Sequence, residues 1–187
     1  NLLPGVSSKG IYKYLANDNE ELYKDNLLSQ SADWIYRNYD IEYELNTDGF
    51  RTVELNGVDW NNSIVVFGCS ITQGIGLNHK DIFCYLLEQH YNLPVINLGD
   101  CGSSIEAIAV NNFALSFKDV IPRAVINFYP SPNRITRFNI NRPEHLQPYE
   151  SLDKIVETYK SILPSNNYSA DDYSNENMFK AKLYSRL

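Results

Sequence analysis

The sequence predicts an α/β fold, organised as a three-layer α/β/α sandwich around a parallel sheet. Three short apolar runs carry this prediction, over residues 63–68, 94–99 and 123–129. Continuous runs of this length are typical of strands that are buried on both faces of a sheet. Helical patterns separate the runs, and strand–helix–strand units at this spacing form right-handed crossovers between parallel strands.

Two helices are expected between these strands. The first spans residues 81–91 and carries its apolar side chains on one stripe, which would face the sheet. The second begins after a cap at Ser103 or Ser104 and runs to about Phe117, with Glu106 in its first turn. The stripe of the first helix consists of Ile82, Phe83, Leu86 and Leu87.

Residues 1–57 are polar and rich in aromatic side chains, so we expect a β-rich extension ahead of an α/β domain over residues 58–187. Trp34 and the tyrosines near it would form a half-buried sheet or, alternatively, a platform for carbohydrate. The other elements expected are a helix over residues 18–28, half-exposed strands over 34–45 and 50–55, and helices over 152–163 and 178–187.

Composition excludes several classes of protein. The chain has 187 residues, 43% of them hydrophobic, and a formal net charge of −7. This acidic balance argues against nucleic acid as a partner. No apolar run approaches the roughly 20 residues that span a bilayer. The three cysteines lack zinc-ligand spacing, so neither a metal site nor a disulfide scaffold is predicted, and no cofactor is expected.

The start of the chain leaves its location open. No basic segment followed by an apolar run marks a secretory signal. The first residue is Asn1 rather than Met, so we expect a processed chain or a part of a longer product. Cytoplasmic and virion-associated locations are both compatible with the sequence, which also leaves the oligomeric state open.

Three loops leave the carboxyl ends of the predicted strands, where ligands gather in parallel sheets. The first, from Gly68 to Gly76, presents Ser70 two residues after a buried strand. The second places Gly102 just before a helix, and the third carries Asn133 after a strand. A hydroxyl, a backbone N–H and a side-chain amide at one edge suit a reaction in which negative charge develops on an oxygen.

Each loop also has a plain structural interpretation, as a glycine-rich connection or an ordinary turn. Nucleotide-binding motifs fit less well. The glycines at 68, 74 and 76 do not form Gly-x-Gly-x-x-Gly, and the chain has no Gly-Lys-Ser or Gly-Lys-Thr of a P-loop. A nucleotide-binding, flavodoxin-like domain is therefore the less favoured interpretation.

Together the three loops resemble the SGNH (GDSL-type) hydrolase superfamily, in a branch found in bacteria and phages. The resemblance covers roughly residues 46–138 and includes the lead-in at residues 46–51. The matching blocks are Gly68-Cys69-Ser70 in place of Gly-Asp-Ser, Asn97 to Gly102 as the second block, and Ser131-Pro132-Asn133 in place of Gly-x-Asn.

The resemblance implies an ester or acetyl-ester hydrolase with Ser70 as the nucleophile. The backbone N–H groups of Ser70 and Gly102 and the Asn133 amide would form the oxyanion hole. The family's late Asp-x-x-His block is missing, although a serine hydroxyl needs a base to accept its proton. His145 is the candidate base in this chain; alternatively, the base lies beyond Leu187 or hydrolysis has been lost.

Two functions follow from the sequence. The first is an SGNH-type serine esterase that acts on a small ester or an acetylated carbohydrate. The second is a non-catalytic SGNH-like binding or structural module of a larger assembly, such as a phage virion. The missing late block and the Asn- and Tyr-rich ends motivate the second.

Overall fold

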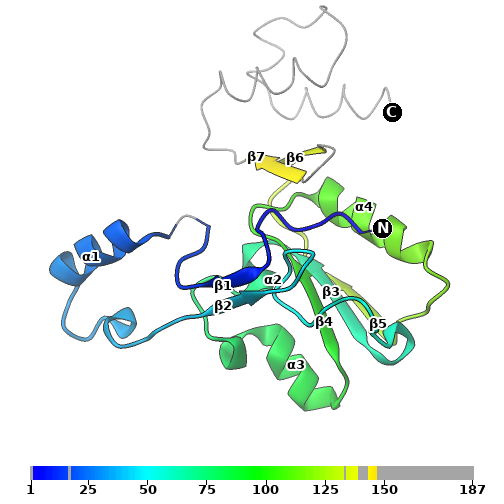
Figure 1. Ribbon diagram of the computed structural model, residues 1–187, viewed down its shortest axis with the longest axis horizontal. Coiled ribbons are helices and arrows are strands. Elements are labelled where there is room, and N and C mark those ends of the chain that lie inside the picture. The colour runs from blue at the N-terminus through cyan, green and yellow to red at the C-terminus, as the bar shows by residue number, and fades with distance from the viewer. Residues whose placement is uncertain (1, 17, 133, 139–142, 147–187) are drawn as a thin grey trace, which may run out of the picture.

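The computed structural model describes residues 2–16, 18–132, 134–138 and 143–146 (Figure 1). At its centre is a three-stranded parallel sheet with the strand order β4-β3-β5. These strands are the three predicted apolar runs, so the α/β class with a parallel sheet is confirmed. Their bounds are β3 (Ile64–Gly68), β4 (Val95–Gly99) and β5 (Ala124–Asn127).

The middle strand is buried because both faces of the sheet are covered. Every residue of β3 and β4 is buried, whereas β5 is partly exposed. Ile64 lies opposite Val95 in β4 and Ala124 in β5, so side chains in register point to the same face. Alternate residues of each strand therefore belong to two different cores.

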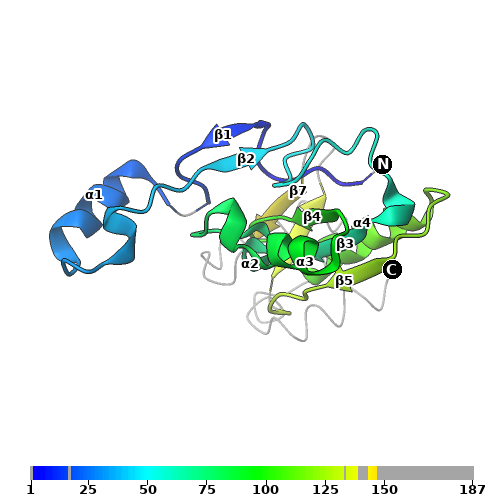
Figure 2. The same cartoon turned by 90° about the horizontal axis from the view of Figure 1, so that it is seen from below.

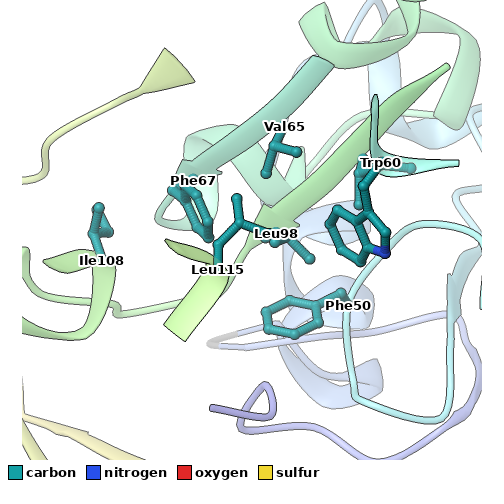
Figure 3. Packing of buried hydrophobic residues seen from close by; sticks show 8 residues of the cluster. Phe50, Trp60, Val65, Phe67, Leu98, Ile108 and Leu115 are labelled. Atoms are coloured by element: carbon teal, nitrogen blue, oxygen red, sulfur yellow. The ribbon is translucent and has the colours of Figure 1, made fainter. Parts of the chain in front are cut away.

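The larger core lies between the sheet and α4 (Ile105–Ser116). Two rings from the segment before the sheet, Phe50 and Trp60, close this core from the side (Figure 3). Burial of such side chains contributes about 1.5–3 kcal/mol each. The buried members are Phe50, Trp60, Val65, Phe67, Ile96, Leu98, Ile108 and Leu115.

The second core lies between the other face of the sheet and α3 (Phe83–Tyr91). Its buried members include Ile64 and Val66 of β3 together with Ile82 and Cys84 at the start of α3. The helices α3 and α4 thus contribute to cores on opposite faces of the sheet. The predicted stripe of α3 is only partly right, because Leu86 is exposed and Cys84 is buried instead. Ser104 caps α4, because its side chain accepts a hydrogen bond from the backbone N–H of Ala107.

A single helical turn, α2 (Ser70–Gln73), follows β3 directly and ends at Gly74. Gly74 has a φ of +78°, and a Cβ added there would lie 2.1 Å from Cγ2 of Ile82. Only glycine fits this position without strain. The close approach of the Gly74 backbone lets the loop fold down onto the residue that precedes α3.

The amino-terminal part only partly matches the prediction. The helix α1 (Glu20–Ser29) is confirmed and is capped by Asn19, and it stands away from the sheet (Figures 1 and 2). The strands β1 (Gly10–Tyr12) and β2 (Tyr43–Leu45) form an antiparallel pair. Most of the strand predicted over residues 34–45 is wrong, because its rings pack on one another. Residues 50–55 form no strand: Phe50 packs in the larger core, Arg51 binds backbone carbonyls, and Val53 is exposed.

Several elements went unpredicted. The strands β6 (Ile135–Phe138) and β7 (Pro143–Leu146) pair antiparallel. The helices predicted over residues 152–163 and 178–187 lie outside the described residues. Among the described residues there are also three short 3-10 turns, η1 (Ile35–Arg37), η2 (Trp60–Asn62) and η3 (His79–Asp81).

In the described sheet β4 is an edge strand, and side chains cap its outward N–H groups. The N–H of Val95 donates to Glu88 Oε2 at 3.0 Å, and that of Asn97 donates to Thr52 Oγ1 at 3.3 Å. The N–H of Gly99 donates to the Asn97 side-chain oxygen at 3.0 Å. An edge whose donors are occupied is a poor template for pairing with another chain.

Candidate functional site

The structure places two of the predicted site residues at neighbouring strand ends. Ser70 is the first residue of α2, directly after β3, and is partly buried. Gly102 lies buried in the turn after β4, with a φ of +84°. The two ends are joined by a hydrogen bond from the Asp100 N–H to the Gly68 carbonyl at 3.1 Å. Asn133 lies outside the described residues.

His145, the candidate base, lies on β7 with both ring nitrogens in hydrogen bonds. Nε2 is 2.8 Å from Asp100 Oδ2, and Nδ1 is 2.8 Å from Thr136 Oγ1. The imidazole is 3% exposed. In this arrangement the ring is bonded to an aspartate and a threonine rather than to Ser70, and the role of His145 as a base stays a prediction.

The hydrogen bonds of His145 continue into a buried polar chain. Thr136 Oγ1 lies 2.8 Å from Ser104 Oγ, the capping oxygen of α4. We assign the ring proton to Nε2 from the bonding pattern. Ser104 then donates to Thr136, Thr136 donates to His145 Nδ1, and His145 Nε2 donates to Asp100. The Asp100 carboxylate also accepts the Val6 N–H, at 3.1 Å to Oδ2 and 3.2 Å to Oδ1.

In this network a base, His145, orients a hydroxyl, that of Thr136, but the network is shielded from solvent. Ser104 is 0% exposed and Thr136 is 5% exposed. A substrate therefore cannot approach either hydroxyl in this state. The contacts instead connect β4, α4, the β6–β7 pair and the amino-terminal segment, and a fully bonded network of this kind fixes one packing arrangement.

The amino-terminal segment covers the same edge of the sheet. The Leu3 N–H donates to Asn111 Oδ1 of α4 at 2.6 Å, and the Gly5 N–H donates to the Asp48 carbonyl at 2.7 Å. Leu2 packs against the larger core. With Val6 held by Asp100, residues 2–6 cover the carboxyl end of β4, the edge where the sequence predicts the ligand-binding loops.

Sequence reasoning also missed Arg51, which is 2% exposed. Its guanidinium donates to the Gly74 carbonyl at 2.8 Å and to the Glu42 carbonyl at 2.9 Å, and it lies 4.7 Å from the centre of the Tyr43 ring. Burial lowers the pKa of this guanidinium. Arg51 thereby joins the glycine-rich loop to the amino-terminal part. Arg51 follows the Asp48-Gly49 turn, and nothing in the sequence near it indicates that its guanidinium is buried against these carbonyls.

Two cavities lie beside the amino-terminal part. One, of about 510 Å³, runs along the edge of β4. The other, of about 760 Å³, lies between α1 and residues 34–43. Both volumes fall in the range of small-ligand sites, about 300–1,000 Å³. The first is lined by Glu42, Glu44, Arg51, His79, Tyr85 and Glu88 among others, and the second by Trp34 and five tyrosines among others.

The described cysteines are free thiols. Burial raises the pKa of the Cys84 thiol to about 12. Burial first, and then the negative charge of Asp100, raise the pKa of the Cys101 thiol to about 11. Both thiols are therefore protonated near neutral pH.

Cys101 is expected to react slowly with iodoacetamide although it is partly exposed. Because the thiolate is the reactive form, its rate at pH 8 should be roughly 100-fold below that of the urea-unfolded chain. The rate should rise about tenfold for each pH unit between 8 and 10, since deprotonation limits it. Mass spectrometry of timed samples measures both rates. A native rate within threefold of the unfolded rate would contradict this prediction.

The described residues hold neither a metal-binding cluster nor a helix that could span a membrane. In this part of the chain no three His, Cys, Asp or Glu side chains are grouped in a way that would hold a metal ion. The helices described there are also too short or too polar to cross a membrane.

Comparison with known proteins gives one informative similarity. No family model and no solved structure matches the chain. The probable GTP-binding protein EngB of Mycoplasma capricolum subsp. capricolum is 28% identical to it over 86 residues. The match covers 44% of this chain and 41% of that protein, so the chain spans less than half the length of this curated relative.

This similarity corrects the function predicted from the sequence. The relative is a GTP-binding protein, so the assignment to the SGNH superfamily is wrong, as are the esterase and the SGNH-like virion module. The small ester and the acetylated carbohydrate are likewise the wrong partners. The physical reason is that small residues and a serine after buried strands occur at the sheet edge of many α/β folds, and a fold does not fix a function. Roles for Ser70, Gly102, Asn133 and His145 at a ligand stay predictions.

Proposed function

We propose that this chain is a nucleotide-binding α/β protein. The observation that carries the proposal is the similarity to a GTP-binding protein, since it names a ligand class. The fold supports it, because a parallel sheet flanked by helices is a common scaffold for nucleotide sites. The two cavities beside the amino-terminal part are large enough for such a ligand.

The phosphates must be held differently from those in a P-loop. The loop after β3 has no lysine followed by Ser or Thr, so no ammonium group reaches bound phosphates from that position. The carboxyl end of β4 is closed by residues 2–6. Binding through the base, with phosphates toward solvent, is the mode compatible with both observations.

We also propose the finer architecture predicted from the sequence. A three-layer sandwich is supported by α3 and α4, which pack in cores on opposite faces of the sheet. A boundary near residue 57 is supported by the separate β1–β2 pair, although Phe50 and Arg51 pack tightly against the following domain.

Urea unfolding with and without nucleotide tests the proposed function. A ligand at 100 times its Kd should raise the free energy of unfolding by about 2.7 kcal/mol. We expect this with GTP or GDP at about 1 mM if Kd is near 10 μM. Sodium triphosphate at equal ionic strength is the control for a general anion effect. The proposal fails if GTP, GDP and ATP all leave the transition unchanged.

A further inference from the structure

Resting on the proposed nucleotide binding, we propose that the 760 Å³ cavity between α1 and residues 34–43 is the site where the base stacks. The site would take a planar nucleobase among aromatic rings, with the ribose and phosphates directed toward solvent. This places the ligand on the amino-terminal part and away from the carboxyl edge of the sheet.

The wall of the cavity is a continuous series of aromatic rings. Neighbouring ring centres are 5.5–6.0 Å apart, within the range of favourable aromatic pairs. Every nucleobase has a π face, so stacking on aromatic rings binds bases strongly without distinguishing the hydrogen-bonding groups at their edges. The series runs Tyr14, Tyr23, Trp34, Tyr36 and Tyr39.

Hydrogen bonds hold several of these rings in place before any ligand arrives. The Tyr23 hydroxyl donates to the Tyr36 carbonyl at 3.0 Å, and the Tyr36 hydroxyl donates to the Gly76 carbonyl at 3.2 Å. The Tyr43 hydroxyl accepts the Gly76 N–H at 2.8 Å. A preorganised wall loses less freedom on binding. These bonds also bring the glycine-rich loop to the cavity through Gly76 rather than through Ser70.

Charged groups at the cavity suit both ends of a nucleotide. Lys13 lies 3.4 Å from Asp40 in an ion pair whose two side chains are well exposed. Such a pair contributes little, so the ammonium group can turn to a phosphate at small cost. Carboxylates of Asp18 and Asp40 can accept hydrogen bonds from an exocyclic amino group of the base, as guanine presents at N2.

The other cavity is the weaker candidate for this ligand. Three glutamates line it, Glu42, Glu44 and Glu88, whereas two aspartates line the aromatic cavity, so carboxylates repel a phosphate more strongly here. Glu88 is already bonded to the Val95 N–H, which it holds as an edge cap. Its ring side chains also form no continuous series. The aromatic cavity therefore combines the two features that a nucleotide needs, a stacking surface and an exposed lysine, Lys13, whose ion pair with Asp40 contributes little.

Fluorescence and calorimetric titration of the full chain with guanosine and GTP test this site. Trp34→Leu removes the central ring and should weaken both ligands at least about tenfold. Lys13→Met should weaken GTP several-fold and leave guanosine unchanged, because only GTP carries phosphates. The matched controls are Tyr91→Leu, an exposed ring on α3, and Lys24→Met, an exposed lysine on α1 that pairs with Glu20. Far-UV circular dichroism checks that each variant is folded.

The outcomes separate this site from the proposed function. If GTP binds the unaltered chain and Trp34→Leu and Lys13→Met bind it equally well, the site is wrong while nucleotide binding stands. If guanosine binds and is lost in Trp34→Leu but GTP does not bind, the stacking site stands and the nucleotide proposal fails. If neither ligand binds the unaltered chain, both are overturned.

Discussion

Replacing Asp100 with alanine is expected to lower the free energy of unfolding by about 1–3 kcal/mol for each hydrogen-bond donor that loses its acceptor. The carboxylate accepts hydrogen bonds from His145 and from the Val6 N–H, and the two side chains of the pair are 7% and 3% exposed. Without Asp100, the imidazole and the backbone N–H are both left buried without their acceptor. Urea unfolding, followed by tryptophan fluorescence and circular dichroism, measures the loss.

The matched control is Asp59→Ala. Asp59 is exposed and makes no capping bond to the η2 turn, so its loss should change stability by no more than about 0.5 kcal/mol. Asp100→Asn should fall between the two, since an amide keeps one acceptor. If Asp100→Ala is no more destabilising than Asp59→Ala, the buried network does not hold the segments together.

Replacing Arg51 with methionine is expected to cost about 3 kcal/mol, because it leaves buried carbonyl groups without donors. The carbonyls of Gly74 and Glu42 lose their partner, and the Tyr43 ring loses its cation. Methionine fills much of the same space, so the loss reports the hydrogen bonds more than a cavity. Arg51→Lys should cost less but still be measurable, since one ammonium group does not span both carbonyls.

Arg123→Met provides the comparison, because Arg123 is exposed and precedes β5. Its expected change is within about 0.5 kcal/mol. Hydrogen exchange adds a local readout: in Arg51→Met the amides of Gly74 and Gly76 should exchange faster, since the loop loses its anchor. Unchanged exchange there would contradict a role for Arg51 in fixing this loop.

The carboxyl end of β4 is covered by residues 2–6, so a ligand site at that end of the sheet is not favoured. In open parallel sheets the ligand usually lies at that edge. Here residues 2–6 cover the carboxyl end of β4, where they are held by Asp100, by Asn111 and by packing on the larger core. The hydrogen-bonded side chains from Ser104 to His145 are buried next to them. The described cavities lie instead beside the amino-terminal part, which is why the proposed base site is placed there.

Local sequence predicted the strands that are buried along their whole length. The run that became β3 is apolar at every position and the run that became β4 is apolar except at Asn97, as is typical of strands buried on both faces of a sheet. The cap at Ser104 was also predictable, since it depends on neighbours within one turn, whereas the stripe of α3 was only partly right because Leu86 is exposed. The alternation over residues 34–45 predicted a strand that is mostly absent, because its rings pack on one another rather than on a sheet.

The sequence by itself determined the α/β class, the three parallel strands and the two helices between them, because these follow from periodicity and caps within short windows. Only the tertiary structure decided which polar groups meet. Asp100 and His145 are 45 residues apart along the chain, and Arg51 lies 23 residues from Gly74. No local pattern encodes such contacts, since they exist only after the sheet, the β6–β7 pair and the amino-terminal segment have packed together.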